Sequence, residues 1–137
     1  MPGGVGSRLR LGARVRGPED VGDALVEFLV GSLVPVAFAL DLAGRIVAYH
    51  CGTTLPCSGE PFNPAHAMRV DAPGVKASGV IVAHAHEGAS TVPFEEDLAA
   101  TQALMLQGRV EGIELVDHII VAGRSWRSLR EATSLWG

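Results

Sequence analysis

The run Val80-Ile81-Val82-Ala83-His84-Ala85-His86, followed after ten intervening residues by Asp97, decides the fold and the candidate site of this chain. Its apolar residues predict a strand that is covered on both faces. Strand side chains alternate between the two faces, so His84 and His86 point to the same side. With Asp97 from the next element they would form a three-ligand set with a fourth position open, as in catalytic zinc sites.

The elements around this run alternate between strands and helices. In an open α/β sheet, ligand sites gather at the carboxyl ends of the strands, where the two histidines lie. Pro93 begins a helix that should end near Gln107, with Gly108 as its stop and Asp97 in its first turn. The other expected elements are helices over residues 19–30 and 64–72 and strands over residues 33–40, 45–50, 79–83, 112–121 and 125–128. This order predicts a three-layer α/β domain, with a mixed β-sheet flanked by helices.

The composition is that of one globular domain. The chain has 137 residues, of which 47% are hydrophobic, enough to fill a single core. Residues 1–17 are rich in glycine and carry four arginines and no acid, which predicts a flexible basic arm or an edge segment ahead of a domain at residues 18–137. The formal net charge of -4 argues against a nucleic acid partner held by a positive field of the whole chain.

Neither a membrane span nor a secretory signal is expected. No apolar run reaches the roughly 18 residues that cross a bilayer, and residues 1–17 contain no apolar segment of the signal-peptide kind. We therefore expect a cytoplasmic protein. Cys51 and Cys57 could close a small disulfide loop, but reduced thiols are the simpler expectation. The oligomeric state stays open, with a homodimer among the options.

The histidine pair and Asp97 resemble the H-x-H-x10-D core of the JAMM (JAB/MPN) metallo-hydrolases, and the flanking sequence resembles the RadC-type branch of that family. Residues 115–121 and 128–131 resemble its closing L-x-D-H-I-I-V and S-L-R-E segments. Shorter matches are the P-E-D-V helix start at residues 18–21, Leu40-Asp41, Gly52-Thr53 and Asn63-Pro64. The resemblance covers about residues 18–135.

The resemblance implies a JAMM/MPN fold, similar to that of cytidine deaminases, and zinc held by His84, His86 and Asp97. It also implies a hydrolase of the metalloprotease or isopeptidase type, which cleaves amide or isopeptide bonds in a protein or peptide. In active members a glutamate at the start of the first core strand takes the proton of the attacking water. A serine three residues before the aspartate stabilises the oxyanion.

The sequence departs from this pattern at the residues that assist catalysis. Leu33 occupies the position of the glutamate, Phe94 that of the serine, and Glu87 that of the proline that usually follows the second histidine. Loss of an oxyanion donor costs roughly two to three decades of rate, and loss of a general base a further two to four. Glu87 is the first candidate for a substitute acid/base group and Glu27 the second. The resemblance therefore predicts a weak enzyme or an inactive one.

Other functions stay open beside the hydrolase. The chain could be a non-catalytic module that keeps the fold and binds a protein tail or a partner subunit. A DNA-associated role rests on fold analogy alone and is opposed by the acidic charge balance. A deaminase is excluded, because its H-x-E and downstream P-C-x-x-C pattern is missing.

Histidines outside the motif have simpler interpretations. His118 lies beside Asp117 in a predicted strand, where structural hydrogen bonding is favoured over metal ligation. His66 and Arg69 either line the cleft or form a solvated helix face. His50 lies next to a cysteine, but a second metal site is disfavoured.

Overall fold

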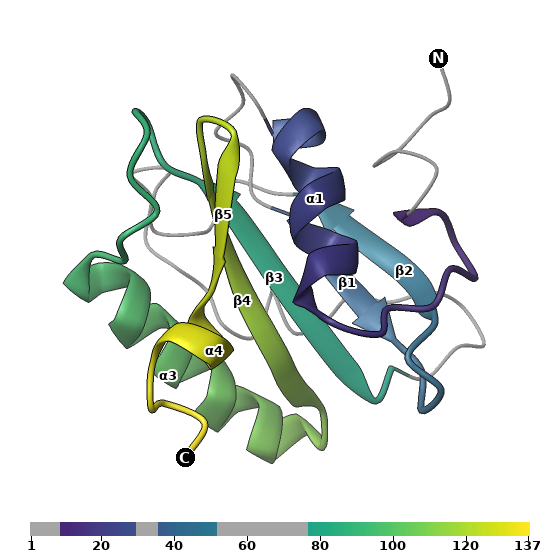
Figure 1. The fold of residues 1–137 in the computed structure, drawn as a ribbon. Coiled ribbons are helices and arrows are strands. Elements are labelled where there is room, and N and C mark those ends of the chain that lie inside the picture. Colours follow the sequence, from purple (N-terminus) through teal and green to yellow (C-terminus); the bar gives the residue numbers. More distant parts are fainter. Residues whose placement is uncertain (1–8, 30–35, 52–76) are drawn as a thin grey trace.

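The computed structural model describes residues 9–29, 36–51 and 77–137 (Figure 1). In these ranges a five-stranded sheet lies between helices. The strands are β1 (Val36–Leu40), β2 (Ile46–Cys51), β3 (Gly79–Ala85), β4 (Glu114–Ala122) and β5 (Ser125–Ser128), and the helices are α1 (Pro18–Leu29), α3 (Glu95–Glu111) and α4 (Leu129–Ala132). The predicted α/β fold with a mixed sheet flanked by helices is confirmed.

The strand order is β2-β1-β3-β4-β5. β3 and β4 run parallel, and the other three neighbouring pairs are antiparallel. Parallel strands need a crossover connection, which α3 provides between β3 and β4. Because the crossover leaves from the carboxyl end of β3, the first turn of α3 follows that end closely in sequence.

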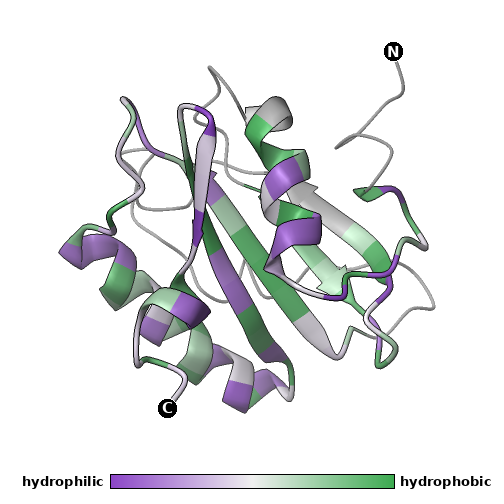
Figure 2. Cartoon of the chain, viewed as in Figure 1, coloured by the Kyte–Doolittle hydropathy of each residue, from purple (hydrophilic) through white to green (hydrophobic). Residues whose placement is uncertain are grey.

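The core has two layers, one on each face of the sheet. Every residue of β1 and β3 is buried, as expected for apolar strands covered on both faces. On one face Phe38 and Ile81 pack in a cluster with Leu25 of α1, and on the other Val82 packs with Leu104 of α3. Figure 2 shows hydrophobic colour along much of β3, hydrophilic stretches along β4, and both colours along α3.

The helix α3 is longer than the sequence predicts. Gly108, the expected stop, lies inside the helix and is buried, and α3 ends at Glu111. Gly112 follows with a φ of 74°, a left-handed conformation that glycine adopts without a steric penalty. The predicted end was wrong because the helix continues through Gly108, its first glycine, and ends only where the backbone must turn toward β4.

The described part of the predicted basic arm lies against the β1–β2 hairpin. The N–H groups of Gly12 and Val15 donate to the carbonyls of Ile46 and Gly44 at 2.7 and 2.8 Å, and Leu9 is buried. The edge-segment alternative therefore fits residues 9–17 better than a free arm does. The boundary at residue 17 stays a prediction, and residues 1–8 lie outside the described residues.

Several sequence predictions concern residues outside the described ranges. These are Leu33, the Gly52-Thr53 match, Cys57, the helix after Asn63, His66 and Arg69, together with the side chains of Glu27, His50 and Cys51. Within the ranges that the structure describes, no helix is long and apolar enough to cross a membrane.

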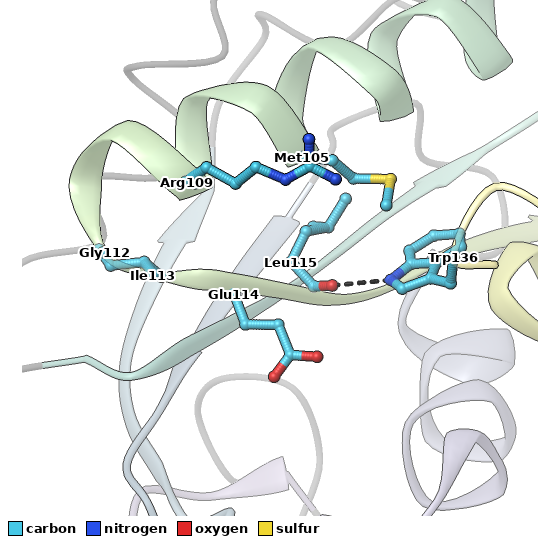
Figure 3. A pocket seen from close by; sticks show the side chains of 8 residues that line it. Met105, Arg109, Gly112, Ile113, Glu114, Leu115 and Trp136 are labelled. Carbon is cyan, nitrogen blue, oxygen red and sulfur yellow. Dashed lines mark hydrogen bonds between the residues drawn. The ribbon is translucent and has the colours of Figure 1, made fainter.

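A pocket of about 350 Å³ lies between the last turns of α3, the start of β4 and the C-terminal tail (Figure 3). Met105, Arg109, Leu115 and Trp136 line it, and Nε1 of Trp136 donates to the Leu115 carbonyl at 2.9 Å. This pocket is near the beginning of β4, whereas the histidine pair lies beside its end. It is therefore separate from the candidate site.

Asp117 ties β4 to the C-terminal part of the chain. Its Oδ2 accepts from the Ser128 hydroxyl at 2.5 Å, and its Oδ1 accepts from the N–H groups of His118 and Arg130 at 2.7 and 3.1 Å. Burial raises the pKa of Asp117, although these donors oppose the rise. The contacts hold the strand that carries His118 against β5 and α4.

We expect Asp117→Ala to destabilise the domain by about 2–4 kcal/mol, because several buried donors lose their acceptor. Asp117→Asn keeps one oxygen for the two N–H groups and removes the buried charge, so its cost should be clearly smaller. Urea unfolding of the two variants and the wild type measures the difference. Equal losses of stability for alanine and asparagine would show that these hydrogen bonds do not hold β4 in place.

Candidate metal centre

His84 and His86 lie at the carboxyl end of β3, on the face of the sheet that α3 covers. They alternate along the chain with Ala83 and Ala85, which belong to the cluster on the α1 face. β3 ends at Ala85, but the His86 N–H donates to the Val121 carbonyl at 2.8 Å and continues the pairing with β4. The alternation expected from the sequence therefore includes both histidines.

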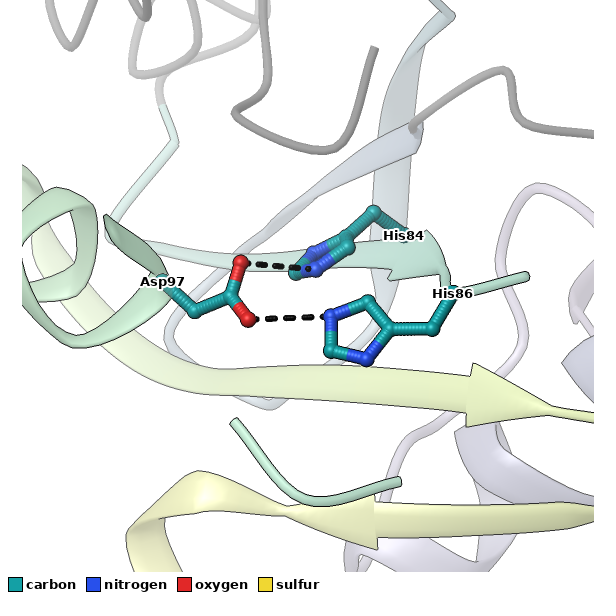
Figure 4. Close-up of side chains that lie close together, drawn as sticks. All are labelled: His84, His86 and Asp97. Carbon is teal, nitrogen blue, oxygen red and sulfur yellow. Dashed lines mark hydrogen bonds and ion pairs between the residues drawn. The ribbon is translucent and has the colours of Figure 1, made fainter. Parts of the chain in front are cut away.

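Asp97 reaches the two histidines from the first turn of α3 (Figure 4). Its Oδ1 lies 3.2 Å from Nε2 of His84, and its Oδ2 lies 2.9 Å from Nε2 of His86. The N–H of Phe94, the N-cap residue, donates to the same Oδ2 at 2.8 Å. The carboxylate thus accepts from an N–H at the start of its own helix while facing both rings.

The three side chains are buried but incompletely hydrogen bonded. His84 is 0% exposed, His86 7% and Asp97 1%. Nε2 of His84 and Nδ1 of His86 have no hydrogen-bond partner among the residues that the structure describes. A buried polar atom without a partner costs about 1–3 kcal/mol. Such atoms in a buried cluster are typical of a site that takes a ligand.

The geometry of the cluster suits a metal ion. One ligand atom from each of His84, His86 and Asp97 lies within 4.8 Å of the others. Ligands of a tetrahedral zinc ion, at about 2.1 Å from the metal, lie roughly 3.4 Å from one another. The observed 3.2 Å between Nε2 of His84 and Oδ1 of Asp97 is close to this separation. Two imidazoles with one carboxylate are a known zinc ligand set that leaves a position open.

The electrostatics keep His84 and Asp97 in the forms that can bind a metal. Burial lowers the pKa of His84, and the nearby Asp97 opposes this only in part. For Asp97, burial by itself would raise the pKa. Contacts with His84 and the Phe94 N–H, together with the charges of His84 and His86, outweigh burial and lower the pKa to about 2. At neutral pH His84 is a neutral imidazole and Asp97 is a carboxylate.

His118 of β4 lies behind His84, on the side away from Asp97. Its Nε2 is 2.8 Å from Nδ1 of His84, and its Nδ1 is 2.7 Å from Oγ1 of Thr101. The Thr101 hydroxyl in turn donates to the Asp97 carbonyl at 2.7 Å. Structural hydrogen bonding of His118 is confirmed, although its ring contacts His84 and Thr101, whereas Asp117 accepts from its backbone N–H.

Thr101 and the orientation of Phe94 are the features that sequence reasoning missed. A threonine within a helix is unremarkable by itself, but its position four residues after Asp97 places it on the same helix face. Phe94, at the position of the family serine, stacks on His86 with ring centroids 4.5 Å apart and planes 15° apart. Its side chain is nevertheless 56% exposed, so it forms an apolar edge of the site.

Glu87, the first candidate acid/base group, is not part of the buried cluster. Glu87 directly follows His86 but is exposed, in the loop that precedes α3. Within the described ranges, the cluster of side chains that could hold a metal ion consists of His84, His86 and Asp97. The catalytic role of Glu87 therefore stays a prediction.

Comparison with known proteins identifies the family. The sequence profile of the RadC-like JAB domain matches residues 63–134, just over half of the chain, and this range includes His84, His86 and Asp97. The chain belongs to the RadC-like JAB family. The resemblance found in the histidine motif and its flanking segments is thus confirmed.

The RadC-like JAB domain is similar to several curated UPF0758 proteins. The one from Trichodesmium erythraeum is 30% identical over 129 residues, which are 90% of this chain and 51% of the relative. The one from Thermosynechococcus vestitus is 31% identical over 97 residues, 71% of this chain and 38% of the relative. A third, from Cyanothece sp., is 45% identical over 60 residues, 44% and 25% of the two chains. The aligned parts thus span about half or less of the relatives' length.

We expect the metal-free RadC-like JAB domain to lose stability as the pH falls below the ordinary histidine pKa. Burial lowers the pKa of His84 and lowers that of His118 well below its usual value. Below about pH 6.5 the unfolded chain therefore binds more protons than the folded one. The free energy of unfolding that the two neutral histidines contribute is fully present above that pH. It is lost as the pH falls, by at most about 1.4 kcal/mol per pH unit for each histidine.

Urea unfolding of chelator-treated protein between about pH 7.5 and 5.5 measures this dependence. His118→Gln is the matched control, because it removes one of the two imidazoles and should reduce the slope. A stability that stays constant or rises as the pH falls would contradict the expectation.

Proposed function

We propose that this domain binds one zinc ion through His84, His86 and Asp97. The observation that carries the proposal is the buried Nε2 of His84, which faces Oδ1 of Asp97 at 3.2 Å and makes no hydrogen bond within the described part of the chain. Imidazole and carboxylate are ligands that zinc accepts in its open, three-residue sites. Neutral His84 and ionised Asp97 need no change of protonation before they bind the metal.

We further propose that the domain is a hydrolase of amide or isopeptide bonds in a protein or peptide. Bound zinc would supply a Lewis acid for the carbonyl and would lower the pKa of a water molecule. The protein side chains hold this chemistry in a fixed place, since both histidines and Asp97 are anchored on the ends of β3 and α3. Glu87, exposed beside the second ligand, is the group proposed to accept and return a proton at its carboxylate.

The rate of this hydrolase should be low. Phe94 has no hydrogen-bond donor in its side chain and occupies the position where active members carry a serine. Leu33, at the position of the general base, cannot accept a proton. The combined loss is roughly four to seven decades of rate if nothing replaces the two groups.

A second candidate function is a non-catalytic module that binds a protein tail or a partner subunit. It is favoured by Phe94, whose ring stacks on His86 and is 56% exposed, and by Val92, which is equally exposed two residues earlier. Exposed apolar side chains next to a buried polar cluster suit contact with an extended peptide better than stabilisation of a developing negative charge.

We expect the wild type, purified without chelator, to contain about one zinc ion per chain, and His84→Ala and Asp97→Ala to contain little. Loss of one of three protein ligands removes most of the binding free energy. Elemental analysis measures the metal content. Glu96→Ala is the matched control for Asp97→Ala, because Glu96 is an exposed carboxylate in the same helical turn. A metal-free wild type would sink the proposed zinc site.

A panel of peptide and isopeptide substrates, incubated with the zinc-loaded domain, separates the two candidate functions. For the hydrolase, Glu87→Gln should lower the rate by about 10²–10⁴-fold without changing the zinc content. Glu96→Gln, again an exposed carboxylate, should leave the rate unchanged. If the zinc-loaded wild type cleaves nothing, the non-catalytic module is the better description.

A further inference from the structure

A closed series of buried contacts begins and ends at Asp97. The Asp97 carbonyl accepts from the Thr101 hydroxyl at 2.7 Å, and Thr101 Oγ1 is 2.7 Å from Nδ1 of His118. Nε2 of His118 is 2.8 Å from Nδ1 of His84, whose Nε2 faces the Asp97 carboxylate. Thr101, His118 and His84 are each 0% exposed. The series joins α3, β4 and β3, the three elements around the candidate site.

The direction of each hydrogen bond follows from the first one. The Thr101 hydroxyl has a single proton, and its geometry directs that proton to the Asp97 carbonyl, an oxygen that can only accept. Toward His118 the same hydroxyl oxygen must then accept, so Nδ1 of His118 carries a proton. A fully buried imidazole is neutral and carries one proton only, which leaves a lone pair on Nε2 of His118.

The same reasoning passes on to His84. Because Nε2 of His118 accepts, Nδ1 of His84 must donate to it, and Nε2 of His84 is left with a lone pair. Nε2 of His84 has no well-aligned hydrogen bond to any described residue, although it lies 3.2 Å from Asp97 Oδ1 and interacts with that carboxylate electrostatically. In the opposite tautomer a proton would stand between His84 and Asp97, where a metal ion would bind.

We propose that Thr101 and His118 are positioning residues, which fix the tautomer of His84 so that the Nε2 lone pair faces the metal position. The proposal rests on the zinc site proposed above and extends it to two residues that touch neither metal nor substrate. The Asp97 carbonyl fixes the direction of the first hydrogen bond, and His118 of β4 passes this direction on to His84. In this way one proposed ligand residue, Asp97, sets the tautomer of another, His84. Partners of this kind typically change metal affinity by about 10–100-fold when they are lost.

The decisive variant is Thr101→Val, which has nearly the same shape and lacks the hydroxyl. Nδ1–H of His118 then has no acceptor, so His118 should change to the Nε2–H tautomer and donate to His84. His84 in turn should change to the Nε2–H tautomer, with its proton toward Asp97. Thr101→Ser keeps the hydroxyl and should keep the wild-type tautomers.

Thr133→Val is the matched control. The Thr133 hydroxyl also donates to the carbonyl four residues earlier, that of Leu129, at 2.6 Å. Thr133 is the residue that follows α4, and the same substitution there removes a hydroxyl bond to the carbonyl four residues earlier without affecting a histidine. An effect on the site that is specific to Thr101 therefore cannot come from the general loss of a threonine hydroxyl.

Two measurements test the proposal. Imidazole ¹⁵N NMR of the metal-free protein, well above the ordinary histidine pKa, reports the tautomers of His84 and His118. Chelator competition reports the zinc affinity, which should fall by about 10–100-fold in Thr101→Val and stay near the wild-type value in Thr101→Ser and Thr133→Val.

The outcomes separate this inference from the proposed function. If the wild type binds zinc and Thr101→Val keeps both tautomers and the wild-type affinity, the inference is overturned and the zinc site stands. If the wild type binds no zinc, the zinc site fails, and the NMR measurement still decides the proton order. If Thr101→Val does not fold, the NMR spectrum of the metal-free wild type still tests the proposal. An Nε2–H tautomer of His84 in that spectrum would overturn it.

Discussion

The parallel pairing of β3 with β4 is the constraint on which the candidate metal centre depends. Its register places Val82 opposite His118 and His84 opposite Ile120, so His84 and His118 lie on one face, two register positions apart. A shift by one residue would move every side chain of β3 to the other face and carry His84 away from α3. The crossover that parallel strands require also returns Asp97 to the end of β3. The parallel pairing, with the crossover helix that it requires, thus brings all three candidate ligands together.

A β-bulge in β4 gives neighbouring polar residues different tasks. Leu115 pairs with Val80 and Asp117 with Ile81, so β4 has one extra residue, Val116, at this point. Beyond the bulge, His118 points to the α3 face and supports His84, whereas the Asp117 side chain accepts from Ser128 of β5. Burying a carboxylate and an imidazole side by side is tolerated because each has hydrogen-bond partners of its own.

The sequence predicts the cluster of candidate ligands better than it predicts the residues around them. Spacing along one strand and one helical turn is local, so His84, His86 and Asp97 could be identified without a structure. The contact of His118 with His84 joins residues 34 apart and depends on the register and on the bulge, neither of which has a periodic signal. The end of α3 was mispredicted for a related reason. Both Gly108 and Gly112 could end a helix, and only the path of the chain toward β4 selects Gly112.

The proposed metal binding and the proposed catalysis would depend on different parts of this site. The ligands and the residues behind them are buried, and replacing them by apolar side chains would remove the cost of the unpaired Nε2 of His84. Stability alone therefore does not account for the cluster, whereas a ligand that binds only the folded chain would offset its cost. The side chains of Phe94 and Glu87, at the positions that bear on catalysis, are exposed, although the Phe94 ring stacks on His86 and its backbone N–H donates to Asp97. If the domain is a hydrolase, its candidate metal ligands can thus stay in place while the rate falls, because the exposed side chains of Phe94 and Glu87 lie outside the buried cluster.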